Sequence, residues 1–217
     1  SQTDFHRTRA MLDRAAARGA ATVFLFDHWK NYSEHFAGGA LPDVVVLPDE
    51  FARSGFLDAV DVGPPCEIEV LPHPGIDEAV QKVLAYGHSA PLPAIALLLD
   101  PTEFADGLGY DWRIALAAAL DAMKQRPGLS LLVKQHPRQD AAVVAEAITA
   151  LHGAVDASLY LEQTERLIAE ACEVWGMTTT ALNVALASGK PIRSFQIGRS
   201  ARGRLASNPH LEPFVIT

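Results

Sequence analysis

Two short runs of polar residues in the second half of the chain have residue types that bind phosphate groups. The first is KQHPR, in which Lys134, His136 and Arg138 carry basic side chains. Such side chains can neutralise a diphosphate, and Pro137 turns the chain so that they can face one crevice. The alternative is a solvated loop that happens to be basic.

The second run is GMTTT, from Gly176 to Thr180, between an apolar strand pattern and an apolar helical pattern. A strand-to-helix turn with hydroxyl side chains presents backbone N–H groups, threonine O–H groups and a positive helix end to one point, where a phosphate can bind. The alternative is that one threonine only caps the helix. We expect four residues to contact phosphate here: Gly176, Thr178, Thr179 and Thr180.

Both runs belong to an alternation of strands and helices that continues towards the end of the chain. The strand patterns cover residues 95–99, 130–134, 158–161, 173–175, 192–197 and 213–216. Gly189 and Pro191 end the helix after the threonines, so this part reads as a βαβ unit. Parallel strands end at one edge of a sheet, and we therefore expect the two runs to form a diphosphate clamp.

The first part of the chain has a second, shorter alternation, with strand patterns at 22–27, 43–47 and 67–71. Three strands are half of a doubly wound sheet, so we expect an incomplete Rossmann-like domain over residues 1–85, with its remaining strands before Ser1. A short helix and then a Gly, His, Ser and Pro segment are typical of a linker. A complete Rossmann-like domain follows over 86–217, and the predicted fold class is α/β with two parallel-sheet domains.

A further candidate site follows the first strand, at Asp27 and His28. The run DHWKNY combines carboxylate, basic, amide and aromatic side chains, as sugar-binding walls do. Asp27 or His28 would then be the catalytic base that activates an acceptor. The alternative is that Trp29 and Tyr32 complete the core.

Composition and charge restrict the classes of partner. A net charge of −8 argues against a nucleic-acid partner. The apolar runs are far shorter than the roughly 20 residues of a membrane span, and we see no secretory signal. Two cysteines without metal-ligand spacing indicate a cytoplasmic protein without a bound metal. We expect no cofactor.

The K-x-H-P loop, the Gly176-x-Thr-Thr-Thr180 turn and the later Gly-Lys-Pro resemble the nucleotide-sugar half of GT-B glycosyltransferases. Similar patterns occur in CDP-glycerol glycerophosphotransferases, polysialyl- and capsule-type transferases and non-hydrolysing UDP-N-acetylglucosamine 2-epimerases. FDHWKNYSEHF and LPDVVVLPDEFA resemble uncharacterised bacterial proteins associated with surface polysaccharides. The resemblance implies that His136 and the threonine hydroxyls contact the donor diphosphate. The chain departs from the epimerases near Asn183, where they carry a glutamate.

The resemblance implies a glycosyl or glycerophosphoryl-type transferase of surface polysaccharide biosynthesis. Its donor would be a nucleotide-diphosphate sugar or polyol, its acceptor a saccharide, and no metal would be needed. Catalysis would come from His136 on the leaving diphosphate. Two alternatives remain: a nucleotide-sugar 2-epimerase, and a non-catalytic nucleotide-sugar-binding or assembly protein.

Overall fold

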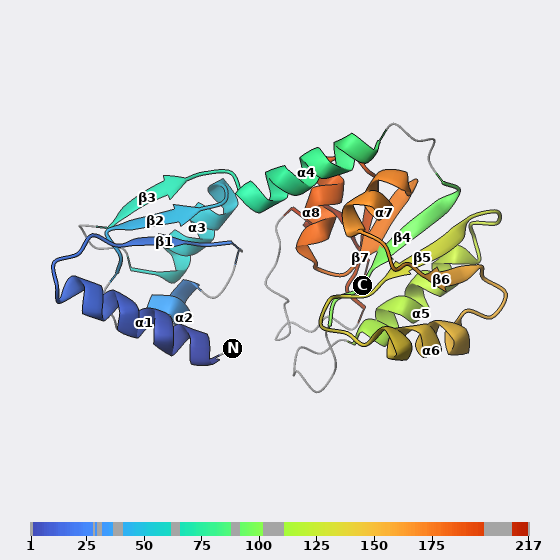
Figure 1. The fold of residues 1–217 in the computed structure, drawn as a ribbon, viewed down its shortest axis with the longest axis horizontal. Helices are drawn as coiled ribbons and strands as arrows, with labels where there is room; N and C mark the ends of the chain where they lie inside the picture. The colour runs from blue at the N-terminus through green and yellow to red at the C-terminus, as the bar shows by residue number, and fades with distance from the viewer. Residues whose placement is uncertain are drawn as a thin grey trace. The chain divides into compact units, whose positions relative to one another are not determined.

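The chain folds into two compact units, Ser1–Pro74 and Gly75–Thr217. The structure is a computed structural model (Figure 1), and it describes residues 2–27, 29, 32–36, 41–61, 66–87, 92–101, 111–197 and 210–216. Each unit contains one sheet, with strand orders β1-β2-β3 and β6-β5-β4-β7-β8-β9. All the strand pairs in both sheets are parallel. The predicted α/β fold class with two parallel sheets is therefore confirmed.

The first unit packs its helices on one face of a three-stranded sheet. Its elements are α1 (Gln2–Ala16), β1 (Val23–Leu25), α2 (Tyr32–Phe36), β2 (Val44–Leu47), α3 (Glu50–Ala59) and β3 (Glu67–Val70). Phe24 on β1 and Val45 on β2 face a cluster with side chains from all three helices. The alternate residues Val23 and Leu25 are 67% and 60% exposed, as expected where side chains point to opposite faces of a strand.

The aromatic residues after β1 stabilise this unit. Tyr32 is buried, and its ring centroid lies 5.0 Å from that of Phe26. Burial, together with the charge of Asp49, raises the pKa of Tyr32 well above its usual range. Trp29 donates its indole N–H to Asp49 Oδ2 at 2.7 Å, and Asp49 Oδ1 caps α3 by accepting the Ala52 N–H at 2.8 Å. Tyr32 thus lies in the core, and Trp29 supports the start of α3.

The second unit has the strand order of a Rossmann fold, with β4 and β7 at the centre. Its elements are α4 (Pro74–Tyr86), β4 (Ala94–Leu98), α5 (Trp112–Met123), β5 (Ser130–Lys134), α6 (Ala141–Leu151), β6 (Ala157–Leu159), α7 (Thr164–Glu170), β7 (Glu173–Gly176), α8 (Thr180–Ala187), β8 (Ile192–Phe195), the 3₁₀ turn η2 (Glu212–Phe214) and β9 (Val215–Ile216).

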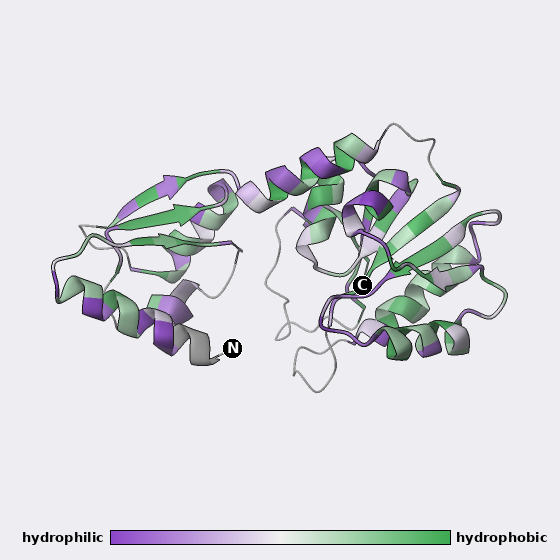
Figure 2. Ribbon diagram, viewed as in Figure 1, coloured by the Kyte–Doolittle hydropathy of each residue, from purple (hydrophilic) through white to green (hydrophobic). Residues whose placement is uncertain are grey.

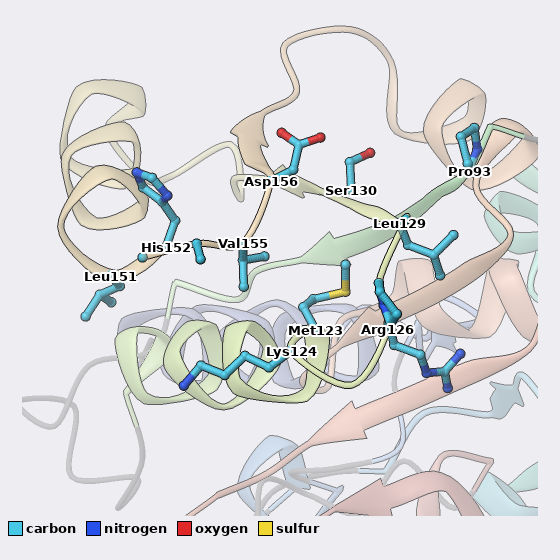
Figure 3. Close-up of a pocket in the computed structure, with 14 residues that line it drawn as sticks. Pro93, Met123, Lys124, Arg126, Leu129, Ser130, Leu151, His152, Val155 and Asp156 are labelled. Atoms are coloured by element: carbon cyan, nitrogen blue, oxygen red, sulfur yellow. The ribbon is translucent and has the colours of Figure 1, made fainter.

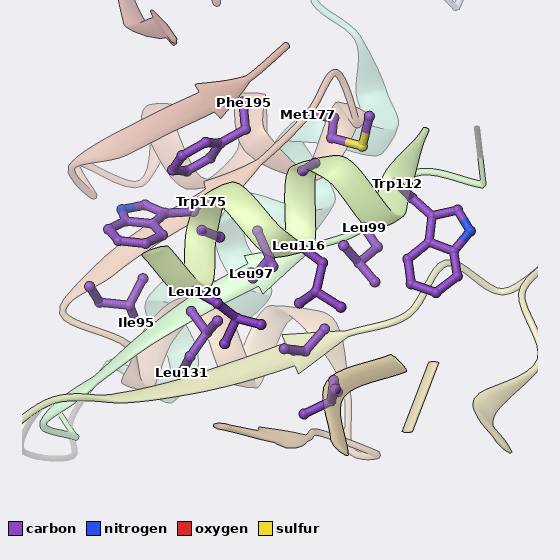
Figure 4. Close-up of a cluster of buried hydrophobic side chains, with 14 of the residues drawn as sticks. Ile95, Leu97, Leu99, Trp112, Leu116, Leu120, Leu131, Trp175, Met177 and Phe195 are labelled. Carbon is purple, nitrogen blue, oxygen red and sulfur yellow. The ribbon is translucent and has the colours of Figure 1, made fainter. Parts of the chain in front are cut away.

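Helices cover both faces of this second sheet. Helices α5 and α6 pack on one face, in a cluster with Leu97, Trp175 and Phe195 (Figure 4). Helices α4, α7 and α8 pack on the other, with Leu98 and Val174. Every residue of β4 is buried, and Figure 2 shows its hydrophobic character. A parallel strand covered on both faces has such a continuous apolar sequence.

The division between the units lies earlier than the position after residue 85 that we expected. Helix α4 packs with the second sheet: Val83 is 2% exposed and shares a buried cluster with Leu98 and Leu167. The Tyr86 O–H donates to Gln163 Oε1 at 2.6 Å. Because these contacts attach α4 to the second unit, the chain divides between Pro74 and Gly75.

No helix in the described part of the chain has the length and apolar character needed to cross a membrane.

Candidate functional site

Three loops meet at the carboxyl edge of the second sheet, after β4, β5 and β7. Strand β4 pairs with β5 on one side and with β7 on the other. Asp100 follows β4, residues 135–140 follow β5, and the threonine turn follows β7. The chain order reverses between β4 and β7, and open α/β sheets bind their ligands at this switch point. The topology therefore brings the two predicted runs to one edge.

Asp100 lies at the centre of this edge and is 6% exposed. Its Oδ2 accepts two hydrogen bonds from Thr178, one from the backbone N–H and one from the side-chain O–H, each at 2.7 Å. The N–H of Thr178 is thus bound to a carboxylate and not open to a phosphate. From the sequence, the segment that begins at Asp100 directly after β4 is predicted to be a spacer before α5 more than a ligand-binding loop, so the pattern alone does not predict this role of Asp100.

Gln139 connects the basic loop to Asp100. Its Nε2 donates to the backbone carbonyl of Asp100 at 3.3 Å, and its Oε1 accepts the backbone N–H of His136 at 2.8 Å. The basic loop and the threonine turn are consequently joined through Asp100 and Gln139. No feature of the residue pattern pointed to Gln139, because its role depends on a contact across 39 residues of sequence.

His136 is held as a neutral hydrogen-bond donor. Its Nδ1 accepts the backbone N–H of Arg138 at 3.1 Å, so the proton of the neutral ring is on Nε2. Burial and the charge of Arg138 lower the pKa of His136, and the carboxylate of Asp100 partly opposes them. The ring is therefore suited to donating Nε2–H to an oxygen atom of a ligand, and not to accepting a proton.

The other two basic residues of the loop have different environments. Lys134 ends β5, and its Nζ donates to the backbone carbonyl of Glu162 and lies 5.8 Å from the centre of the Tyr160 ring. Burial lowers the pKa of Lys134. The structure thus holds this ammonium towards the segment after β6. Arg138 is exposed and acts on His136 through its charge.

Gly176 has a packing role in the structure. It is the buried last residue of β7, and a Cβ there would lie 3.0 Å from the backbone oxygen of Leu98 and 3.1 Å from the side chain of Leu182. Only glycine fits such a close approach between β7, β4 and α8. This glycine would be needed whether or not a ligand binds.

The remaining threonines begin α8. Thr179 is the N-cap residue, and its Oγ1 accepts the Ala181 N–H at 3.4 Å, as the capping alternative expected. Thr180 is the first helical residue and is exposed. The exposed Thr180 thus lies at the same sheet edge as His136.

Strand β8 supports the threonine turn from the other side. The Ser194 O–H donates to the backbone carbonyl of Met177, and the buried Gln196 donates its Nε2–H to Ser194 Oγ at 2.9 Å. Asn183, in the part of α8 that departs from the epimerase pattern, is 7% exposed. The turn is therefore fixed by β4 through Asp100 and by β8 through Ser194.

Asp27 lies at the corresponding carboxyl edge of the first sheet. A mostly apolar pocket of about 270 Å³ opens there, lined by residues at the ends of all three strands, among them Asp27, Leu47 and His73. Asp27 is exposed and His73 is half-buried. His28, which we expected to act with Asp27, lies outside the described residues.

A larger pocket of about 690 Å³ lies at the amino edge of the second sheet (Figure 3). Met123, Leu129 and Val155 contribute apolar side chains to it. The cations beside it are paired, Lys124 with Asp121 and Arg126 with Glu173. Within the described ranges, no three His, Cys, Asp or Glu side chains gather as metal ligands would.

Comparison with known proteins supports the fold. No family model matches the chain, and no curated protein matches it. A solved structure described as "Crystal structure of GtfA/B complex" matches with a TM-score of 0.54 and 14% identity, over 93% of this chain and 42% of that chain. The chain therefore has a GT-B-like fold and spans less than half the length of this structural neighbour.

Proposed function

We propose that this chain belongs to a GT-B-type glycosyl or glycerophosphoryl-type transferase and binds the nucleotide-diphosphate donor at the carboxyl edge of the second sheet. The observation that carries this proposal is the network at the switch point, in which Asp100 and Gln139 hold the threonine turn and His136 together. The GT-B-like fold of the structural neighbour supports it. So do the residue patterns shared with nucleotide-sugar enzymes.

The proposed chemistry is glycosyl transfer with the nucleoside diphosphate as the leaving group. The bond between the sugar carbon and the diphosphate oxygen breaks, and its electron pair stays on that oxygen. In glycerophosphoryl transfer the P–O–P bond breaks instead, and the electron pair stays on the oxygen of the leaving nucleoside monophosphate. Donors already aimed at the leaving oxygen stabilise the developing negative charge. In this chain those donors are the Nε2–H of His136, the Thr180 O–H and the backbone N–H groups that begin α8. They can act without a metal.

The basic side chains of the loop contribute differently to neutralising the proposed diphosphate. Arg138 supplies positive charge near His136. Lys134 already donates to the Glu162 carbonyl, so in the proposed complex it neutralises charge at longer range. The negative charge of Asp100 lies beside Thr178, so in the proposal the diphosphate lies against Thr179 and Thr180.

In the proposal, the first unit binds and activates the acceptor. The new bond forms between the transferred group and an acceptor hydroxyl, whose proton passes to a base. Asp27 is the candidate base, since it is exposed at the rim of the pocket at the end of β1. A saccharide could pack its apolar C–H face on the proline and leucine side chains of that pocket. The pathway proposed is surface polysaccharide biosynthesis, in the cytoplasm.

The test is a thermal-shift and calorimetric titration of the 217-residue chain with UDP, CDP and their sugar or glycerol conjugates. We expect the Tm to rise with at least one of them. The His136→Ala variant should fold normally but bind about tenfold more weakly, because it loses one charge-assisted hydrogen bond. The matched control is His152→Ala, on the far edge of the sheet, which should bind as the parent does. No stabilisation by any of these nucleotides would reject the proposal.

The epimerase alternative is the less favoured of the enzyme classes. Those enzymes carry a glutamate in the region where this chain has Asn183, Val184 and Ala185, so the ribose or sugar recognition that the glutamate would provide is missing here. An assay of UDP-N-acetylglucosamine turnover separates the two: we expect no 2-epimer to form. A protein that binds nucleotide sugar but shows neither transfer nor epimerisation would instead be the non-catalytic binding or assembly protein.

A further inference from the structure

We propose that Asp100 and Gln139 form a positioning bridge, which holds the basic loop and the threonine turn in the mutual arrangement that a diphosphate needs. The bridge consists of the carboxylate and carbonyl of Asp100 and the side-chain amide of Gln139. The inference rests on the proposed function, since the diphosphate is the ligand that this arrangement serves.

One end of the bridge fixes the threonine turn. Thr178 gives both its backbone N–H and its side-chain O–H to the same Asp100 oxygen, each at 2.7 Å. Two bonds to one atom define both the backbone and the side-chain torsion of Thr178. They are charge-assisted bonds, and Asp100 is 6% exposed, so water competes weakly for its carboxylate.

The other end fixes the basic loop. The Gln139 amide donates to the Asp100 carbonyl at 3.3 Å and accepts the His136 N–H at 2.8 Å. Gln135 adds a bond to the backbone carbonyl of Gln139 at 3.4 Å. The backbone of His136 is thereby tied to Asp100, while the Arg138 N–H sets the orientation of its ring.

Neither residue of the bridge is suited to contact the diphosphate itself. The carboxylate of Asp100 would repel phosphate oxygens, and its Oδ2 is already shared by two donors. The Gln139 amide is fixed by the bridge through its Oε1 and one Nε2–H, and its second N–H is a neutral donor without the charge that favours phosphate binding. The two residues therefore act through Thr178 and His136, and their role is positioning.

A double-mutant cycle tests the bridge with UDP and CDP as probes. His136→Ala and Gln139→Ala should each weaken binding by about tenfold, and the double variant should be little weaker than either single one, because groups that act as a unit are not additive. Additive losses, about a hundredfold in the double variant, would overturn the bridge. Thr178→Val should behave as Gln139→Ala does, while Thr178→Ser keeps both donors and should bind as the parent.

A measurement without nucleotide separates this inference from the proposed function. In the parent, the ¹⁵N shifts of the neutral His136 ring should report the Nε2–H tautomer. In Gln139→Ala the loop is released and the tautomers should mix; an unchanged spectrum would overturn the bridge. If Gln139→Ala does not fold, Gln139→Glu keeps the acceptor for the His136 N–H and loses the donor to Asp100. Tautomer mixing without UDP or CDP binding in the parent would support the bridge and reject the proposed ligand.

Discussion

The state of single hydrogen-bonding groups decides what the site can do. The sequence pattern KQHPR predicts a cluster of cations, but in the structure the Nδ1 of His136 accepts a hydrogen bond from the Arg138 N–H, which leaves Nε2–H as the donor of the ring. Lys134 is held by the Glu162 carbonyl. In the proposed complex, the diphosphate is therefore stabilised by oriented N–H and O–H dipoles more than by side-chain cations.

The stability of the protein should depend on pH through His136. Its pKa is lowered in the folded state by burial and by Arg138, so the unfolded chain takes up the proton first. The contribution of neutral His136 to the free energy of unfolding is therefore complete above the ordinary histidine pKa of about 6.5. It is lost as the pH falls below that value. The free energy of unfolding, measured with urea, should fall less between about pH 7.5 and about pH 5.5 in His136→Gln than in the parent. Equal losses in the two proteins would contradict this assignment.

Gly176→Ala should destabilise the second unit by about 1–3 kcal/mol, the usual cost of overpacking. The added Cβ would lie 3.0 Å from a backbone oxygen of β4, which cannot move away as a side chain can. The measurement is the Tm from circular dichroism. An unchanged Tm would mean that this glycine is present for a ligand and not for packing.

At the scale of elements, the sequence predicted the second unit well. Strand 130–134 has the predicted ends, and the other strands lie within a few residues of their patterns. Buried parallel strands have continuous apolar sequences, and Gly, Pro and Asp residues mark the helix ends, so these elements are encoded locally. Helix α2 was missed because its five residues are stabilised by aromatic contacts with β1 and α3, which no local pattern reveals.

Two helix caps should differ in strength although both are aspartates. Asp49 caps α3 and also accepts the Trp29 N–H, whereas Asp140 caps α6 at an exposed position through the Ala142 N–H alone. We expect Asp140→Ala to cost about 1 kcal/mol and Asp49→Ala about 2 kcal/mol or more, since the latter also removes the carboxylate that accepts the Trp29 N–H. Chemical unfolding followed by circular dichroism measures both. A smaller loss for Asp49→Ala would show that the Trp29 contact adds nothing.

At the scale of the whole molecule, each unit has its own core, and the proposed donor site lies within the second. The two parallel sheets could be predicted because strands and helices alternate throughout. The division between the units and the hydrogen bonds that join the two loops could not be predicted, because both depend on contacts between distant residues, such as Val83 with Leu167 and Gln139 with Asp100.

Fragments of the chain test this organisation. Residues 75–217 should fold and bind UDP or CDP with the affinity of the whole chain. Residues 86–217 lack α4 and so expose the apolar surface that Val83 covers; this fragment should have a lower Tm or aggregate. Calorimetry and Tm measurements on both fragments provide the comparison, and equal stability would show that α4 is a linker.

The central claim is that the carboxyl edge of the second sheet binds a nucleotide diphosphate. Its most direct test is the ¹H–¹⁵N spectrum of the chain during titration with UDP and CDP. We predict that the largest shift changes occur at the amides of His136, Thr179 and Thr180. Changes confined to the amino-edge pocket of Figure 3, at Leu129 and Val155, or the absence of any change, would contradict the account.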